Sequence, residues 1–373
     1  MRKKALWALG LVAVALVLAS CAPHATQSTL KPAGPTAQEE KNLFIPVFWI
    51  AVGVFVLVEG GIVWIVIRYR HRKGQDRIPK QTHGNTRLEI GWTIAPALLL
   101  AAVMVPTVSL IWKLAAPPPP GALHITVEGY QWWWCFQYTD ADMQVDYGST
   151  PEPITVADVM VIPAGRTVYL SLSSEGGGAH SSNGIPDYVV IHSFWAPRLF
   201  GKQDVVPGRT NHITFSAFAP GTFTGQCAEF CGLEHGRMKF RIVALDQSDW
   251  NAWVADQKQP GSSPTSALAK QGEQIFLNPL SNDRGSCVAC HSVGGTAASG
   301  TAAPNLTHFA NPNHQCFAGC NWDVFNPDGS PNTTDLAAWL HDPNAVKLGA
   351  KMPDYDLSQS EINALMAYLF SLK

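Results

Sequence analysis

Two long apolar segments, residues 43–67 and 88–114, constrain the fold of this chain more than any other feature. Each is long enough to cross a bilayer, which takes about 20 residues. A chain inside a bilayer must satisfy its backbone polar groups within a helix or a closed barrel. The segments therefore predict a two-helix transmembrane hairpin over residues 43–114. Two buried helices of a soluble protein are the competing interpretation.

The charges between these segments predict how the hairpin is oriented. The connecting loop contains one acid, Asp76, among many basic residues. The basic residues are Arg68, Arg70, Arg72, Lys73, Arg77, Lys80 and Arg87. Positively charged loops stay on the cytoplasmic side of a membrane. The chain is therefore expected to enter and leave the membrane on the outer side, where everything after residue 114 would lie.

The N-terminus supports the same orientation. Residues 1–20 begin with three basic side chains and continue with a short apolar run, which is the pattern of a secretory signal. The run ends in Leu18-Ala19-Ser20-Cys21, which resembles a bacterial lipobox with Cys21 as the lipidated residue. An ordinary signal peptide with a chance cysteine is the alternative. Residues 21–42 predict a tether outside the cytoplasm, so we expect a bacterial cell (inner) membrane protein whose later domains face the periplasm.

The sequence pattern of the chain changes after the hairpin. Residues 122–245 alternate short β-branched and aromatic runs with Gly and Pro turns, which predicts an all-β sandwich or barrel. The expected strands are 124–127, 159–162, 167–170, 188–191 and 212–215. Residues 246–266 predict a flexible linker, and residues 267–373 predict an all-α domain. Its expected helices are 267–276, 335–340 and 358–372.

Composition and cysteine spacing limit the function. Charged residues are 14% of the chain and the formal net charge is −2, so no basic bias indicates a nucleic-acid partner. The eight cysteines include three close pairs, and pairs beside His and Met indicate metal or haem chemistry before disulfides. The pairs are Cys227 with Cys231, Cys287 with Cys290, and Cys316 with Cys320.

The loop at residues 226–238 gathers two thiols, an imidazole and a thioether. The donors are Cys227, Cys231, His235 and Met238. Soft sulfur with imidazole selects copper or zinc, and zinc rarely uses methionine. His192, at the end of an apolar run, is the expected further ligand. Two cysteines favour a sulfur-bridged pair of coppers over a mononuclear blue site. A disulfide between the cysteines and a structural role for His192 are the alternatives.

A second motif, Cys287-Val288-Ala289-Cys290-His291, is the attachment signature of a c-type haem. Cys287 and Cys290 would form thioethers to the haem, and His291 would be its proximal ligand. Met352 is the predicted second axial ligand, and His/Met ligation raises the potential. Met366 lies in the middle of a predicted helix and is assigned to the core. A thioredoxin-like pair is the competing interpretation, and it lacks both the adjacent His and a βαβ pattern.

The remaining cysteines have simpler interpretations. Cys316 and Cys320 predict a local disulfide that braces a loop, with a further metal site involving His314 as the alternative. Cys135, after an aromatic run, is predicted to be a buried free thiol.

These motifs give the chain a specific family resemblance. Residues 43–245 resemble subunit II of haem–copper cytochrome c oxidases, and residues 267–373 resemble a small class I cytochrome c. The resemblance is carried by Glu89-Ile90-Gly91-Trp92-Thr93 with Pro96, Gly129-Tyr130-Gln131-Trp132-Trp133-Trp134, His192-Ser193-Phe194-Trp195 and the Cys-x-Glu-x-Cys loop. It implies a multidomain membrane protein of caa type: a transmembrane hairpin, a cupredoxin domain and an all-α cytochrome c domain.

For the copper site, the resemblance implies a dinuclear CuA centre. Cys227 and Cys231 would bridge the two copper ions, His192 and His235 would each cap one, and Met238 would be a weak ligand. The backbone carbonyl of residue 229 would be another ligand.

The resemblance assigns further roles outside the loop. The Glu229 carboxylate would face a magnesium ion shared with subunit I. Trp132 matches the tryptophan through which electrons enter, and Glu89 matches an acid near the mouth of a proton path. One feature departs from the family: Val189 stands where an acid usually precedes the first copper histidine, after an insertion at 176–186, and Asp187 is the nearest acid. This departure bears on how a soluble cytochrome c would dock.

The implied function is that of the subunit that receives electrons in a proton-translocating cytochrome c oxidase. Electrons would pass from its haem, or from an external cytochrome c, to the copper pair and on to subunit I, where O2 is reduced to water. Subunit I, subunit III, the lipid bilayer and a periplasmic or membrane electron donor are the implied partners. A copper-less quinol oxidase subunit and a copper–haem module of another membrane reductase are the alternatives.

Overall fold

The computed structural model describes most of the chain. The described residues are 10, 12, 25–71, 74, 81, 83–147, 151–174, 190–281, 284–311 and 316–373. The predictions for the signal segment, for lipidation of Cys21 and for the insertion at 176–186 with Asp187 and Val189 fall outside them. Most of the basic loop and His314 do so as well.

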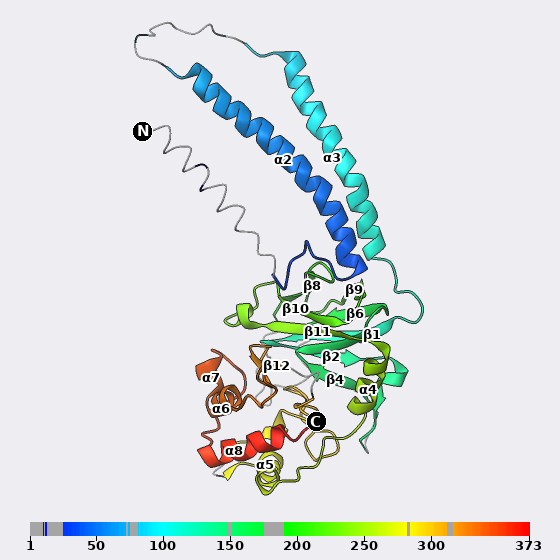
Figure 1. Ribbon diagram of the computed structural model, residues 1–373, viewed down its shortest axis with the longest axis vertical. Helices are drawn as coiled ribbons and strands as arrows, with labels where there is room; N and C mark the ends of the chain where they lie inside the picture. The colour runs from blue at the N-terminus through cyan, green and yellow to red at the C-terminus, as the bar shows by residue number, and fades with distance from the viewer. Residues whose placement is uncertain are drawn as a thin grey trace.

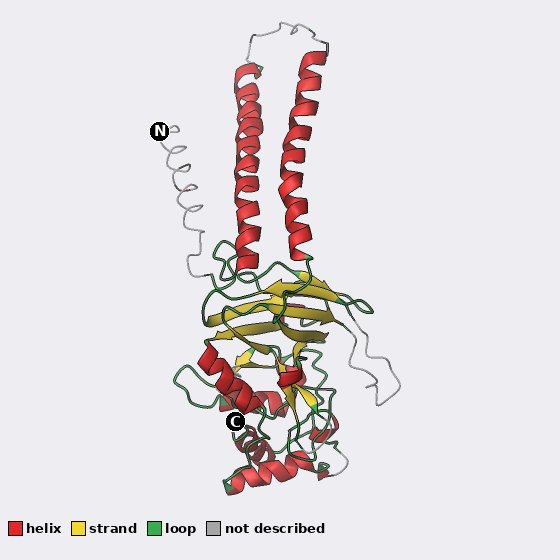
Figure 2. Ribbon diagram, turned by 90° about the vertical axis from the view of Figure 1, so that its right-hand side faces the viewer, coloured by secondary structure: helices red, strands yellow, loops and turns green. Residues whose placement is uncertain are grey.

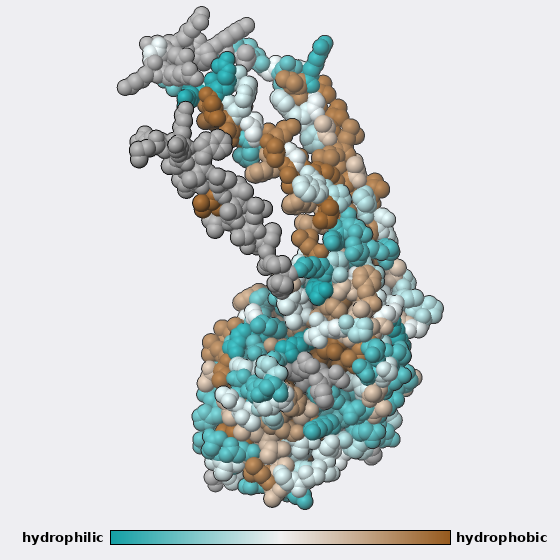
Figure 3. Space-filling model, viewed as in Figure 1, coloured by the Kyte–Doolittle hydropathy of each residue, from teal (hydrophilic) through white to brown (hydrophobic). Residues whose placement is uncertain are grey.

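Two long helices form the hairpin expected from the apolar segments. Helices α2 (Pro35–Tyr69) and α3 (Thr86–Leu114) run side by side and extend away from the rest of the molecule (Figures 1 and 2). Pro35 stands in the first turn of α2, where its missing N–H costs nothing, and the Asn85 side chain caps α3. Both helices are apolar over a membrane-spanning length, with their apolar side chains facing outward (Figure 3). This is a membrane protein.

Helix α2 begins earlier than residue 43, the start of the predicted span. Its first turns are polar and pack on the β domain: the backbone N–H of Ala37 donates to the carbonyl of Leu199 at 3.2 Å, and Glu40 accepts from the N–H of Gly201 at 2.9 Å. These contacts fix the hairpin to the β domain. Hydropathy identifies only the apolar part of such a helix.

The predicted β domain is a two-sheet sandwich. One sheet has the strand order β3-β4-β2-β1-β6-β9 and the other the order β5-β11-β10-β7-β8. The first sheet comprises β1 (Leu123–Tyr130), β2 (Trp133–Tyr138), β3 (Gln144–Val145), β4 (Glu152–Ala157), β6 (Val168–Ser173) and β9 (Asn211–Phe215). The second comprises β5 (Val159–Pro163), β7 (His192–Trp195), β8 (Gln203–Val205), β10 (Gly221–Cys227) and β11 (Lys239–Leu245).

Aromatic rings fill the space between the two sheets. Trp134 and Phe136 of β2 meet Phe194 of β7 and Phe240 of β11, with Phe194 and Phe240 stacked at a centroid distance of 4.0 Å. All four rings are fully buried. Burying rings of this size is worth about 2–3 kcal/mol each. The core therefore fixes β7 and β11, the two strands that flank β10 in the second sheet.

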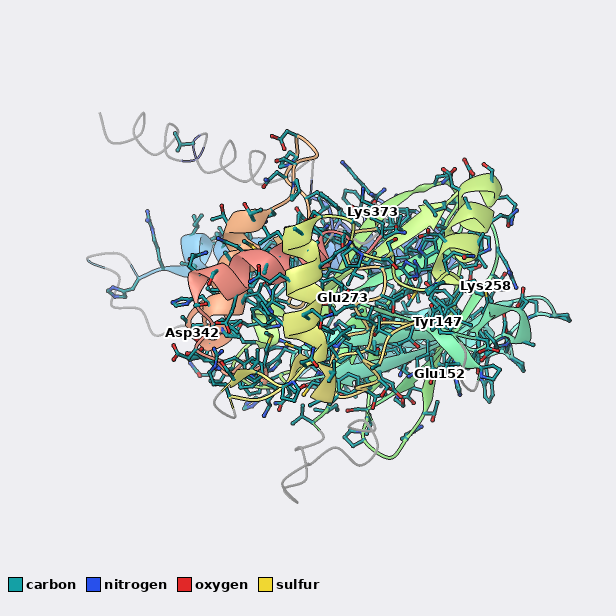
Figure 4. The ribbon with its side chains drawn as sticks, turned by 90° about the horizontal axis from the view of Figure 1, so that it is seen from below. Tyr147, Glu152, Lys258, Glu273, Asp342 and Lys373 are labelled. Atoms are coloured by element: carbon teal, nitrogen blue, oxygen red, sulfur yellow. A yellow bond between two sulfur atoms is a disulfide. The ribbon has the colours of Figure 1, made fainter. Side chains whose placement is uncertain are left out.

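The prediction of a linker over residues 246–266 is wrong in its first half. Helix α4 (Gln247–Gln257) begins there, capped by the Asp246 side chain, and buries Trp250 and Trp253 against Tyr138 of β2. Tyr147 and Lys258 join the end of this helix to the β domain, with the Tyr147 hydroxyl donating to the Gln257 carbonyl at 2.9 Å (Figure 4). The polar residues 247–249 at its start and the neighbouring Pro- and Ser-rich stretch concealed the helix.

The C-terminal domain is helical, as expected. It contains α5 (Ala267–Leu277), α6 (Thr333–His341), the short α7 (Pro343–Val346) and α8 (Gln359–Leu369). Helices α5 and α8 cross at Gly272, and Met366 is buried in the domain core, as its place in the sequence predicted. A capping box between Ser358 and Glu361 begins α8.

A small hairpin connects the helical domain to the sandwich. Strands β12 (Cys316–Phe317) and β13 (Trp322–Asp323) lie between the two domains (Figure 1), and Cys316 and Cys320 form the expected disulfide within this segment. The carbonyl of Gly319 accepts from the N–H of Lys239 at 3.1 Å, and Arg241 pairs with Asp323 at 2.5 Å. The two domains are therefore in direct contact.

Candidate metal and haem centres

Strand pairing brings the first predicted ligand to the loop. Strands β7 and β10 pair antiparallel, with Cys227 opposite Phe194, so that His192 lies at the same end as Cys227. The His192 Nδ1 is 3.8 Å from the Cys227 Sγ, which is 3.8 Å from the Cys231 Sγ. All three residues are buried. Both thiols are free, so the alternative of a disulfide between them is not adopted.

The loop after β10 brings in the remaining donors. A 3₁₀ turn at His235–Arg237 places both His235 and Met238 against Cys231. The Cys231 Sγ is 3.7 Å from the His235 Nδ1 and 3.8 Å from the Met238 Sδ, and the carbonyl oxygen of Glu229 lies 3.3 Å from the Cys227 Sγ. Two sulfurs thus occupy the middle with one imidazole beside each. This donor set fits a copper pair bridged by sulfur.

Contacts within the loop favour a thiolate. The Cys231 thiol, His192 and backbone groups at Glu229 and Ser193 hydrogen-bond to Cys227 and hold its pKa well below that of a free thiol. A thiolate is the form that binds a metal. Burial of Cys227 and Cys231 keeps water away from the two sulfurs.

Gly129 of β1 leaves room for the His192 ring. A Cβ at position 129 would lie 2.8 Å from the imidazole Cδ2 and 3.2 Å from the Trp134 ring. Both rings are buried, so neither can move without disturbing the core. The absence of a side chain at position 129 is therefore needed to aim His192 at Cys227.

Replacing Gly129 with alanine is expected to weaken copper binding about tenfold or more, because the displaced imidazole no longer points at its metal. Copper titration of the purified protein measures this affinity. A Thr126→Ser change on the same strand, where the side chain is half-buried, is the control. Wild-type affinity in the Gly129→Ala protein would show that His192 does not need this space.

Trp132 connects the copper loop to the rest of the molecule. Its indole Nε1 donates to the carbonyl of Cys231 at 3.0 Å, beside a second bond from Gln131 at 2.8 Å. Only 5% of Trp132 is exposed, because Gly319 and Gly349 of the helical domain lie against it. The residue assigned to electron uptake is thus covered by the chain's own C-terminal domain.

The four predicted haem-binding residues line one cavity of about 270 Å³. They are Cys287, Cys290, His291 and Met352. The His291 Nδ1 donates to the carbonyl of Pro304 at 2.8 Å, which orients the ring and leaves Nε2 for a metal. Burial lowers the pKa of His291 and so favours the neutral, ligating imidazole. Met366 is not among the lining residues. This arrangement fits a haem held between His291 and Met352.

The opposite wall of this cavity comes from the β domain. Gly129, Tyr130, Trp132 and Trp133 line it, together with the predicted copper ligand His192. The haem cavity and the copper site therefore share a wall. The sequence contains no signal for this contact, since the two segments are far apart in the chain.

Two other predicted residues do not line this cavity. Glu89 is exposed in the first turn of α3, and the Glu229 carboxylate lies 3.9 Å from the Lys202 Nζ at the surface. Their roles at a proton path and a magnesium ion stay predictions. Cys135 is a buried free thiol, as predicted.

Sequence reasoning missed two buried charged residues at the domain contact. Lys347 follows α7, and Asp158 lies between β4 and β5; they are 3% and 2% exposed. The Lys347 Nζ donates to the carbonyl of Trp132 at 2.6 Å. A single lysine in a short loop segment gives no sign of burial, because this side chain is normally exposed.

The fold and the two candidate sites define a class: a membrane-anchored cupredoxin domain joined to a c-type cytochrome. Residues 123–245 match the family model of the cytochrome c oxidase subunit II periplasmic domain, residues 23–110 that of its transmembrane domain, and residues 269–373 that of cytochrome c. The chain belongs to the cytochrome c oxidase subunit II family and carries a C-terminal cytochrome c domain.

Known relatives match over nearly the whole length. Cytochrome c oxidase subunit 2 of Alkalihalophilus pseudofirmus is 37% identical over 96% of this chain and 94% of its own. The Bacillus subtilis protein of the same name is 33% identical over 97% and 96%. Among solved structures, the periplasmic domain of subunit II of cytochrome oxidase from Bradyrhizobium japonicum is 28% identical, covering 38% of this chain and 96% of its own, with a TM-score of 0.29.

Proposed function

We propose that this chain receives electrons for a proton-translocating cytochrome c oxidase and relays them from a covalent haem c to a dinuclear copper centre. The observation that carries the proposal is the shared wall: His192, beside the thiols, also lines the cavity that contains His291 and Met352. When bound, each of the two cofactors can accept and donate one electron. The chain's residues hold these carriers close together and away from water.

The roles of individual residues follow from their positions. In this proposal Cys227 and Cys231 would hold the copper ions between them, while His192, His235, Met238 and the carbonyl of Glu229 would complete the set. Cys287 and Cys290 would attach the haem to the chain, and His291 and Met352 would ligate its iron. Rigid strands and a packed aromatic core hold the copper ligands in place, which keeps the geometry of the site constant when its charge changes.

The order in which electrons reach the haem and the copper follows from the burial of Trp132 under the helical domain. Because the helical domain lies on this tryptophan, an external donor cannot reach it directly. A cytochrome c, or another periplasmic or membrane donor, therefore delivers electrons to the haem domain first. In this proposal the electrons then reach subunit I, where O2 is reduced to water.

Membership of the family implies association with subunit I, and subunit III is a further proposed partner. The hairpin anchors the chain in a bacterial cell membrane, and both cofactor domains lie on the periplasmic side. In the same proposal the Glu229 carboxylate contributes to a magnesium site shared with subunit I, and Glu89 lies near the mouth of a proton path.

Two alternative functions can be distinguished from the proposed one. A quinol oxidase subunit would have no use for the donors gathered around Cys231 or for the haem cavity. A copper–haem module of another membrane reductase would keep both sites and differ in its partner. Metal content separates the first alternative, and the identity of the partner subunit separates the second.

The direct test is to purify the full chain with its complex from a bacterial host that matures c-type haem. We expect about two copper ions and one covalent haem per chain, an EPR signal from an electron shared by two coppers, and co-purification of a haem–copper subunit I. A mononuclear blue-copper signal, or no copper in folded protein, would refute the copper assignment. A different partner subunit would favour the other reductase.

A further inference from the structure

Lys347 is a buried cation at the contact between the C-terminal cytochrome c domain and the β sandwich, which is called the copper domain below. Its Nζ donates to the carbonyl oxygens of Trp132 at 2.6 Å and Ala318 at 2.9 Å. Lysine is almost never fully buried unless it is paired. Burial lowers the pKa of Lys347 to about 8, so the ammonium is still charged at neutral pH. The side chain thus reaches from the segment before Met352 to the backbone of the copper domain.

Asp158 of the copper domain is the largest source of negative charge near this ammonium, and the buried Glu234 adds to it. Its Oδ1 accepts from the N–H of Trp134 at 3.0 Å and its Oδ2 from the N–H of Gly319 at 2.8 Å. Burial raises the pKa of Asp158 to about 6, and attraction to Lys347 opposes that rise. Asp158 therefore ties strand β2 to the disulfide-closed loop of the cytochrome c domain.

Two glycines allow the domains to come this close. A Cβ at Gly319 would lie 2.7 Å from the Trp132 carbonyl oxygen and 2.8 Å from the Lys347 Nζ. A Cβ at Gly349 would lie 3.1 Å from the Trp132 ring and 3.2 Å from Leu233. Both glycines have positive φ, at +74° and +78°. The backbone at Gly319 and at Gly349 therefore lies directly against Trp132, next to the Lys347 side chain.

The contact continues to the copper site through hydrogen bonds. Lys347 bonds to the Trp132 carbonyl, and the Trp132 indole bonds to the carbonyl of Cys231. Met352 is five residues beyond Lys347 in the chain. Electron tunnelling weakens steeply with each added gap through space, so a small separation of the two domains slows transfer.

We propose that Lys347 is a positioning residue for electron transfer between the two domains, because it ties the segment carrying Met352 to the carbonyl of Trp132. The inference rests on the proposed function. The step it assists moves one electron: the haem iron is oxidised by one unit and the copper pair is reduced by one unit. No bond is made or broken, and no proton is transferred.

The test compares the full chain in its oxidase complex with a Lys347→Met variant, which keeps the length of the side chain and removes its donors. A light-driven one-electron reductant reduces the haem, and the optical bands of both centres follow the electron to copper. We expect transfer to slow about tenfold or more, as small misplacements of reacting groups do. The haem spectrum, haem potential and copper EPR signal are expected to match the wild type. These readouts separate positioning from damage to either site.

Three further variants make the result decisive. Lys270→Met removes an exposed lysine of the same domain and should keep the wild-type rate, while Lys347→Arg retains donors and should restore much of it. Asp158→Asn, which tolerates the positive φ of 60°, provides a second test if Lys347→Met does not fold, and it should slow the same step. Wild-type transfer in Lys347→Met, or in Asp158→Asn when that variant is needed, would overturn the inference. A wild-type complex without the shared-electron copper signal would overturn the proposed function itself.

Discussion

Replacing Cys231 with serine is expected to abolish electron flow through the copper centre. The Cys231 Sγ lies within 3.8 Å of donor atoms of Cys227, His235 and Met238, so it stands in the middle of the donor set. A serine hydroxyl is hard and stays protonated, so it cannot bridge two soft ions. Even residues that only support a ligand change metal affinity by 10- to 100-fold. Loss of a bridge should therefore lower oxidase turnover by at least about 100-fold.

Copper analysis and EPR of the purified complex check this result. The Cys231→Ser complex should contain at most about one copper per chain and lack the signal of a shared electron, while its haem spectrum stays normal. Cys135→Ser is the matched control, because Cys135 is also a buried free thiol of the same domain and belongs to no predicted site. Full copper content and full turnover in the Cys231→Ser complex would contradict the bridging assignment.

The residues of the candidate copper and haem sites could be located from the sequence because most of the donors of each set lie in a short segment. The donors from Cys227 to Met238 lie within one loop, and the haem thiols with His291 lie within five residues. His192 needed one more step, from the end of an apolar run to its strand partner. The pairing of β7 with β10 shows the physical reason for that step: neighbouring strands bring residues distant in sequence to one edge.

The domain contact could not be predicted, because nothing local signals it. Lys347 and Trp132 are 215 positions apart, and Asp158 is a lone acid between two strands. Helix α4 was missed for a related reason. Its two tryptophans pack on Tyr138 in a distant strand, and the helix begins with the polar residues 247–249. Tertiary contacts determine the structure of such segments, and the sequence pattern alone does not reveal those contacts.

Replacing Gly272 with alanine is expected to prevent the cytochrome c domain from folding stably. Helices α5 and α8 cross so closely at Gly272 that a Cβ there would lie 1.9 Å from the carbonyl oxygen of Ala364 and 2.8 Å from the Tyr368 Cβ. These are backbone and core atoms of a helix, which cannot move aside as a flexible side chain can. In an open helix the same change would gain up to about 1 kcal/mol. Here we expect a loss of about 3 kcal/mol.

This loss should be visible as less covalent haem per chain and as a fall of about 10 °C or more in the melting temperature of the haem domain, measured by the haem absorbance of the full chain. The copper EPR signal should persist, because the sandwich has its own core. Gln271→Ala is the control, since that neighbouring side chain on α5 is exposed and its loss should change neither quantity appreciably. A Gly272→Ala chain with full haem content and an unchanged melting temperature would mean that α5 and α8 can separate at no cost. The haem cavity, which Leu365 and Leu369 of α8 help to line, would then depend on contacts other than this crossing.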